Sequence, residues 1–176
     1  MKNLLRSFAI VALIMSAGTA MAQQKIGHIN SGVLLQSMPE VKTADATFET
    51  FRVTKLNELE AMEKERQAKI VTYQDKYKTL SEANKEVLGQ ELENLGQEIQ
   101  TMSERIGEMD QKAQEELAQK REELYQPILA KAEAAVQAVA KAEGFSYVFD
   151  TANQALVFFE GGIDITPSVK TKLGIQ

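Results

Sequence analysis

One run of apolar residues at coiled-coil spacing constrains this chain more than any other feature. Between positions 88 and 113, apolar residues follow one another at alternating steps of four and three. They are Leu88, Leu92, Leu95, Ile99, Met102, Ile106, Met109 and Ala113. A repeat of about 3.5 residues over this length is typical of a left-handed coiled coil. The sequence therefore predicts a long helix that packs along a second helix.

A weaker seam precedes this one and predicts the partner helix. Its residues at the same spacing are Leu56, Leu59, Glu63, Arg66, Ile70, Tyr73, Tyr77 and Leu80, of which Glu63 and Arg66 are charged. Residues 79–84 separate the seams, and Ser81 there can cap the following helix. We expect a helical hairpin with its tip at 79–84. The first arm would begin at Pro39, because proline is tolerated in a first helical turn.

Short β-like segments flank the helical region. Residues 25–29 alternate polar and apolar, with Ile26 and His28 on one face and Gly27 and Ile29 on the other. Residues 145–150 and 155–159 are predicted as two further strands. The fold class predicted is therefore α+β, mostly α, with a long antiparallel coiled-coil hairpin and a small β head built from the two ends of the chain.

Several residues predict where the helices begin and end. Asn30 offers an N-cap to a short helix, and Thr166 offers one to the last helix, where a proline follows. Pro127 can bend the returning helix, because it lacks an amide donor. Gly144 and Gly174 are placed to end helices.

Three short strands bury too little surface to form a stable sheet by themselves. We therefore expect an oligomer in which sheets from several copies share one core. The head is assigned to residues 23–38 and 128–176, and the arm to 39–127. The candidate residues for the shared core are Ile26, Ile29, Tyr147, Phe149, Leu156 and Phe158.

The first residues predict export across a membrane. Lys2 and Arg6 precede an uncharged apolar run, and small residues end at Ala22. This is the layout of a secretory signal peptide, with cleavage expected after Ala22. The run is about half the length of a membrane-spanning helix. We expect residues 1–22 to be removed, leaving a periplasmic protein without stable membrane insertion.

Composition excludes several functions. Without Lys2 and Arg6, the 20 basic residues become 18 against 25 acidic ones, a net charge of −7, which disfavours nucleic-acid binding. The chain has no cysteine and one histidine, His28, so no thiolate or paired-imidazole metal site is expected. Asp150 and Asp164 could form an acid/base pair, but each lies beside a turn or helix start, where aspartate commonly binds backbone amides. We expect no enzyme activity, no cofactor and no metal.

A few apolar residues are candidates for contact with another protein. Phe48 and Phe51 lie off any clear seam, and exposed apolar groups near one another often mark binding sites. Met62 has a side chain that adapts its shape to varied apolar partners. Packing within the hairpin is the alternative for all three.

The order of several short motifs resembles the Skp/OmpH family of periplasmic chaperones. The segments that carry the resemblance are 25–30, 38–41, 80–82, 127–129, 144–150 and 161–166. The resemblance implies a homotrimer with a β-rich head and three helical-hairpin arms, which holds unfolded outer-membrane β-barrel precursors without ATP or chemistry. The rival interpretation is an extracytoplasmic coiled-coil scaffold or adaptor that binds one defined partner.

Overall fold

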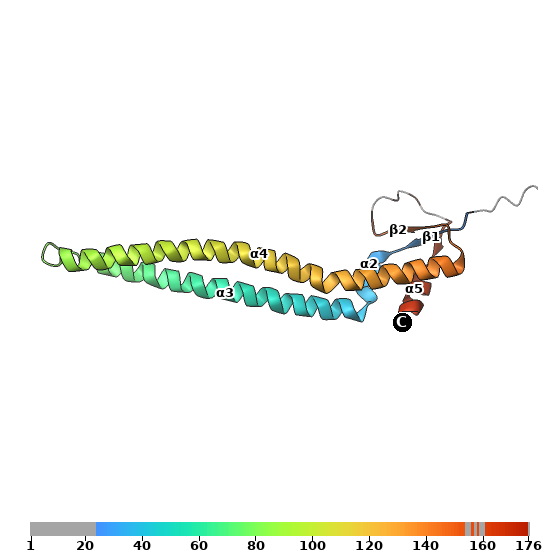
Figure 1. Cartoon of the computed structure of the whole chain (residues 1–176), viewed down its shortest axis with the longest axis horizontal. Coiled ribbons are helices and arrows are strands. Elements are labelled where there is room, and N and C mark those ends of the chain that lie inside the picture. Colours follow the sequence, from blue (N-terminus) through green and yellow to red (C-terminus); the bar gives the residue numbers. More distant parts are fainter. Residues whose placement is uncertain (1–23, 154–155, 157, 159–160, 176) are drawn as a thin grey trace, which may run out of the picture. The chain divides into compact units, whose positions relative to one another are not determined.

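The computed structural model describes residues 24–153, 156, 158 and 161–175, so the predicted signal peptide lies outside the described residues. The elements are β1 (Ile26–Ile29), α2 (Ser31–Ser37), α3 (Pro39–Lys78), α4 (Lys85–Glu143), β2 (Tyr147–Asp150), β3 (Ile163–Asp164) and α5 (Thr166–Leu173) (Figure 1). Two long helices and a small sheet of strands from both ends of the chain confirm the predicted α+β, mostly α, fold class.

The chain divides into two compact units. The first, here the hairpin unit, comprises residues 36–131. The second, here the sheet unit, comprises the described residues before position 36 and after position 131. Helix α4 begins in the hairpin unit and ends in the sheet unit.

The break between α3 and α4 is stabilised by Asn84. Its Oδ1 accepts a hydrogen bond from the Ser81 amide at 2.7 Å, and its Nδ2 donates to the Thr79 carbonyl at 2.9 Å. The Asn84 carbonyl accepts from the Leu88 amide, so Asn84 directly precedes the first turn of α4. The predicted capping role of Ser81 was wrong, because the helix begins four residues later, at Lys85.

The seam predicted for α4 is confirmed by burial. Leu92, Met102 and Ala113 are buried, and the five other seam residues between 88 and 113 are half-buried. Apart from Gly89 and Gly96, the residues between them are exposed. Pro127 lies inside the continuous helix, where its missing amide leaves the Glu123 carbonyl without its usual helical donor.

The seam predicted for α3 was half wrong. Leu59, Arg66, Ile70 and Tyr73 are half-buried as expected, but the other four predicted positions, Leu56, Glu63, Tyr77 and Leu80, are exposed. The observed inward positions between 44 and 76 include Ala44, Phe48, Phe51, Lys55, Leu59, Met62, Arg66, Tyr73 and Lys76. Inward positions follow at two successive steps of four residues, from 51 to 55 and on to 59, so the heptad repeat is shifted from this point on. Lys55, Arg66 and Lys76 occupy seam positions, where their aliphatic stems pack against the other helix.

The sheet is parallel, with β1 between β2 and β3. Gly27 lies against an aromatic ring: a methyl group added there would meet Phe145 Cε1 at 2.8 Å. The φ angle of Gly144 is +74°, and the Phe145 amide bonds the Ala140 carbonyl, so Gly144 ends α4 as predicted.

The C-terminal strands differ from the prediction. β2 lies inside the predicted 145–150 segment. Of the predicted strand 155–159, only Leu156 and Phe158 lie within the described residues, and neither belongs to a strand. The third strand is instead β3, which the sequence analysis missed because it is two residues long. Gly174, with φ +72°, ends α5 as predicted.

The core of the sheet unit combines β1, α2, α5 and the end of α4. Its fully buried side chains include Leu34, Ile165 and Val169. The end of α4 contributes Ala132, Ala135 and Val139, each under 8% exposed. Small residues at this spacing let other elements approach the helix closely, as the alanine-rich sequence predicts.

Candidate functional site

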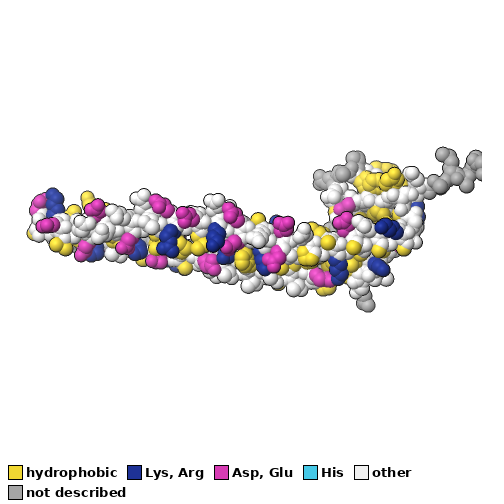
Figure 2. All heavy atoms as spheres, in the orientation of Figure 1, with side chains coloured by type: hydrophobic (Ala, Val, Ile, Leu, Met, Phe, Trp, Pro, Cys, Tyr) yellow, Lys and Arg dark blue, Asp and Glu magenta, His cyan; other side chains and the backbone are white. Residues whose placement is uncertain are grey.

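One face of the sheet is apolar and exposed. Paired residues share a face, and the pairing of Ile26 with Tyr147 and of His28 with Phe149 puts these four on one side. Ile26, Tyr147 and Phe149 are 46%, 53% and 43% exposed, and the two aromatic rings stack with centroids 6.3 Å apart. Figure 2 shows hydrophobic side chains gathered on the sheet unit. A surface of this kind typically marks an interface.

A hollow of about 300 Å³ lies on this face and brings together most of the predicted shared core. Ile26, Phe149, Leu156 and Phe158 line it, together with His28 and glycines at 27, 161 and 162. Phe158 is 72% exposed. Ile29 lies on the other face of β1 and is buried in the chain's own core, so it does not contribute to the hollow.

Asp150 organises the carboxyl end of β2. Its side chain accepts hydrogen bonds from the Ser31 amide at 3.1 Å, from the Ser31 hydroxyl at 2.6 Å and from the Ala152 amide at 3.0 Å. Burial tends to raise the pKa of Asp150, but the hydrogen bonds from Ser31 and Ala152 outweigh it and lower the pKa. The structure therefore supports the backbone-binding interpretation of this aspartate.

Asp164 has the same role at the start of α5. Its Oδ1 accepts from the Thr166 amide at 2.8 Å and from the Thr166 hydroxyl at 2.6 Å, and the Thr166 oxygen accepts from the Asn30 amide at 3.2 Å. Burial opposes these bonds, yet the pKa of Asp164 is lowered, with a small contribution from His28. Thr166 was predicted as the N-cap of α5 but lies inside its first turn, because Asp164 binds the amide.

Ion pairs between α3 and α4 run along the hairpin unit. Lys55 pairs with Glu116 at 2.8 Å, Lys69 with Glu98 at 2.6 Å and Lys76 with Glu91 at 2.6 Å. The hydrogen bond to Glu116 raises the pKa of Lys55. Each pair joins a lysine of α3 to a glutamate of α4, which fixes the antiparallel alignment of the two helices.

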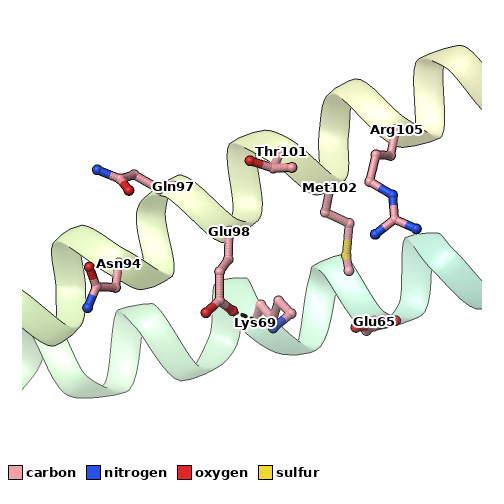
Figure 3. A pocket seen from close by; sticks show the side chains of 8 residues that line it. All are labelled: Glu65, Lys69, Asn94, Gln97, Glu98, Thr101, Met102 and Arg105. Carbon is pink, nitrogen blue, oxygen red and sulfur yellow. Dashed lines mark hydrogen bonds and ion pairs between the residues drawn. The ribbon is translucent and has the colours of Figure 1, made fainter.

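A polar groove lies midway along the hairpin unit (Figure 3). Its volume is about 530 Å³, and the Lys69–Glu98 ion pair spans it. The other lining residues are Glu65, Asn94, Gln97, Thr101, Met102 and Arg105. The lining balances two acidic against two basic side chains.

Exposed apolar residues on the hairpin unit are spread out rather than collected in one pocket. Val53, Leu56, Val71, Tyr77 and Val87 are between 41% and 70% exposed. The predicted client-contacting residues Phe48, Phe51 and Met62 are half-buried at seam spacing. Placing Phe48 and Phe51 off the seam was wrong, because the frame shift near Lys55 was not visible in the apolar pattern.

The part of the chain that the structure describes contains no group of three or more histidine, cysteine, aspartate or glutamate side chains that could hold a metal ion. Among the same residues, no helix combines the length and apolar character needed to cross a bilayer.

Comparison with known proteins places this architecture. The fold is that of a helical-hairpin protein with a small parallel sheet. The OmpH-like outer membrane protein family matches residues 25–173, and the chain belongs to this family. The resemblance found in the sequence is thereby confirmed.

A solved structure shares the fold. It is described as an OmpH-like outer membrane chaperone from Caulobacter crescentus, and it aligns with a TM-score of 0.69 at 18% identity, covering 85% of this chain and 83% of that one. A search of curated proteins found no match. Family membership supports a chaperone role in general terms.

Proposed function

We propose that the protein is an ATP-independent periplasmic holdase chaperone, which binds unfolded outer-membrane β-barrel precursors and prevents their aggregation. The observation that carries this proposal is the scattering of exposed apolar side chains along the hairpin unit, from Val53 to Val87. Many weak, separate contacts suit a chain with no fixed shape, whereas a folded protein partner would need one continuous interface patch.

The sheet unit supports a second part of the proposal, a homotrimer. Its exposed face carries Ile26, Tyr147, Phe149 and Phe158. An apolar face of this kind is normally buried against another protein surface. Sheet faces from three copies would supply that surface. We accordingly assign 23–38 and 128–176 to an oligomerisation head and 39–127 to an arm.

The remaining parts of the proposal concern processing and chemistry. Residues 1–22 would direct export and be removed after Ala22. Binding and release would need neither catalysis nor nucleotide, because each contact is weak and a folding client takes its own apolar groups away.

The proposal is tested with the mature chain and an urea-unfolded outer-membrane barrel diluted into buffer. Mass measurement should give a trimer that takes up the barrel, and turbidity should fall as the chaperone is added. A monomer or dimer that leaves the barrel to aggregate would contradict both parts and favour an adaptor for a folded partner.

A further inference from the structure

The exposed surface of α3 near its start is divided by charge. One side carries Lys42, Asp45, Glu49 and Arg52. Arg52 pairs with Glu49 at 2.7 Å. The other side, here the uncharged face, consists of exposed residues at helical spacing without one charge. They are Thr43, Ala46, Thr47, Thr50, Val53 and Thr54. Glu40 and Glu58 border this face, and their carboxylates are paired with Lys131 and Lys55.

The threonines of this face do not present free hydroxyl donors. Thr47 donates to the Thr43 carbonyl at 2.8 Å, Thr50 to the Ala46 carbonyl at 2.9 Å and Thr54 to the Thr50 carbonyl at 2.9 Å. With each hydroxyl turned to the backbone, the methyl group is left as the outward contact. The face therefore behaves as a mildly apolar surface.

The threonines of the uncharged face differ from the residue types that are usual on the exposed flank of a coiled-coil helix. Flanking positions of a coiled coil are usually glutamate or lysine, which solvate the helix and pair across it. Threonine is a poorer helix former than either. Local choices that oppose both solubility and helix propensity commonly mark a functional surface.

The uncharged face continues into a mostly apolar hollow of about 500 Å³ within the hairpin unit. Thr43 and Thr47 line this hollow from α3, and Leu124 and Ile128 line it from α4. Its one charged lining residue is Glu40, whose carboxylate is paired with Lys131. Ile128 is 8% exposed and Ala44, which also lines the hollow, is 4% exposed. This volume suits one or two large apolar side chains.

We propose that the uncharged face and this hollow form a groove for an extended, charge-poor strand segment of an unfolded outer-membrane barrel. The inference rests on the proposed holdase function and names the contact surface. Strands of such barrels alternate apolar residues with small or polar ones. Eleven helical steps from Thr43 to Thr54 span about 16 Å, the length of about five residues of extended chain. A charged segment would lose hydration there and gain little, because the bordering carboxylates of Glu40 and Glu58 are already paired with lysines.

The test places charge on this face with both signs. Thr50→Lys with Thr54→Lys, and Thr50→Glu with Thr54→Glu, are compared with Gln67→Lys and Gln74→Lys, exposed positions on the other flank of α3. Lysine and glutamate favour helix more than threonine does, so the fold should be retained, and circular dichroism checks it. Binding of a fluorescent urea-unfolded barrel is measured by titration at fixed salt.

Both pairs at 50 and 54 should raise the half-saturation concentration about tenfold, with the Gln67/Gln74 pair within about twofold of the parent. Equal binding of the barrel by all variants would overturn the proposed groove, and so would weaker binding in only the lysine pair or only the glutamate pair. In either case, binding by the parent chain would still support the holdase function. Loss of oligomer mass in the Thr50/Thr54 variants without client would assign the face to contact between copies and overturn it too. A parent chain that ignores the barrel defeats the holdase and the groove together.

Discussion

The hydroxyl of Tyr125 on α4 donates a hydrogen bond to the carboxylate of Asp45 on α3, 80 residues away in sequence. A second cross-helix contact, the ion pair of Lys131 with Glu40, lies near the same end of the hairpin unit. The two contacts fasten the first part of α3 to α4 at the end of the hairpin unit that lies far from the tip.

Replacing Tyr125 with phenylalanine removes the first of these contacts. We expect Tyr125→Phe to lower the free energy of unfolding by about 1 kcal/mol at pH 7, measured by urea titration at fixed protein concentration. Tyr77→Phe, at a ring 60% exposed, is the control and should change it little. Equal stability of Tyr125→Phe and the parent would contradict the contact's role.

The same hydrogen bond predicts a dependence on alkaline pH. The hydrogen bond from the Tyr125 hydroxyl to Asp45, together with burial, raises the pKa of Tyr125 above its ordinary value of 10.0. A raised pKa in the folded state means that the stabilisation is complete below the unfolded value and is lost as pH rises through the folded one. The stability gap between the parent and Tyr125→Phe should therefore shrink above about pH 10. A constant gap up to pH 12 would count against this account.

Two glycines should respond oppositely to alanine. At Gly27 the new methyl would lie 2.8 Å and 2.9 Å from ring carbons of Phe145 and 3.2 Å from the Ile163 carbonyl oxygen. Gly27→Ala should cost about 1–3 kcal/mol, because the ring and strand must shift. At Gly89 nothing lies within 4 Å, so Gly89→Ala should stabilise the helix by about 0.5–1 kcal/mol. Thermal melts measure both effects. Melting temperatures of the two variants that shift in the same direction from the parent would contradict this prediction.

Acid should weaken the sheet unit through Asp150. The pKa of Asp150 is lowered in the folded state, so its stabilisation is present above the unfolded value, near 3.9, and is lost as pH falls through the folded one. Asp150→Asn should cost about 1–3 kcal/mol at pH 7, since Ser31 loses a charged acceptor. Tyrosine fluorescence and near-ultraviolet dichroism between pH 7 and pH 2 measure both effects. The difference in free energy of unfolding between Asp150→Asn and the parent should narrow only in the acid range. A difference independent of pH would show that ionisation of Asp150 is not the cause.

Lys55 offers a test of the polar seam. Its side chain is 17% exposed and its ammonium lies 2.8 Å from Glu116 and 3.3 Å from Glu58. Partly exposed ion pairs contribute little net stability, whereas leucine at a seam position packs against the other helix. Lys55→Leu should therefore raise the unfolding midpoint. A lower midpoint would show that the ion pairs outweigh apolar packing at this position.

Phe149 tests the proposed assembly of the sheet unit. Its ring is 43% exposed and lines the hollow on the sheet's outer face. Phe149→Lys should reduce the oligomer mass in solution, because three copies would bring three charges into one core. Val33→Lys, at an equally exposed apolar residue of α2, is the matched control and should leave the mass unchanged. An unchanged mass for Phe149→Lys would remove this face from the interface.

The sequence predicted the regular parts of the fold and missed the parts that depend on tertiary contacts. The α4 seam, from Leu88 to Ala113, was correct because an unbroken apolar period leaves one helix face to bury. The α3 seam was half wrong because lysine and arginine hold inward positions there. β3 was missed because Ile163 and Asp164 form a strand only beside β1. The hollow under Thr43 and Thr47 involves Leu124 and Ile128, about 80 positions away, and no local pattern marks such a pairing.

The order of strands in the sheet has a consequence for how the protein is made. β1 is the central strand and comes first in the chain, whereas both of its neighbours come after α4. The contact order of this unit is therefore high, while that of the hairpin is low near its tip, where α3 leads directly into α4. As the chain emerges from its N-terminus onward, α3 and α4 can pair before β2 and β3 have emerged. The apolar face of the sheet then forms last, after the rest of the chain is complete.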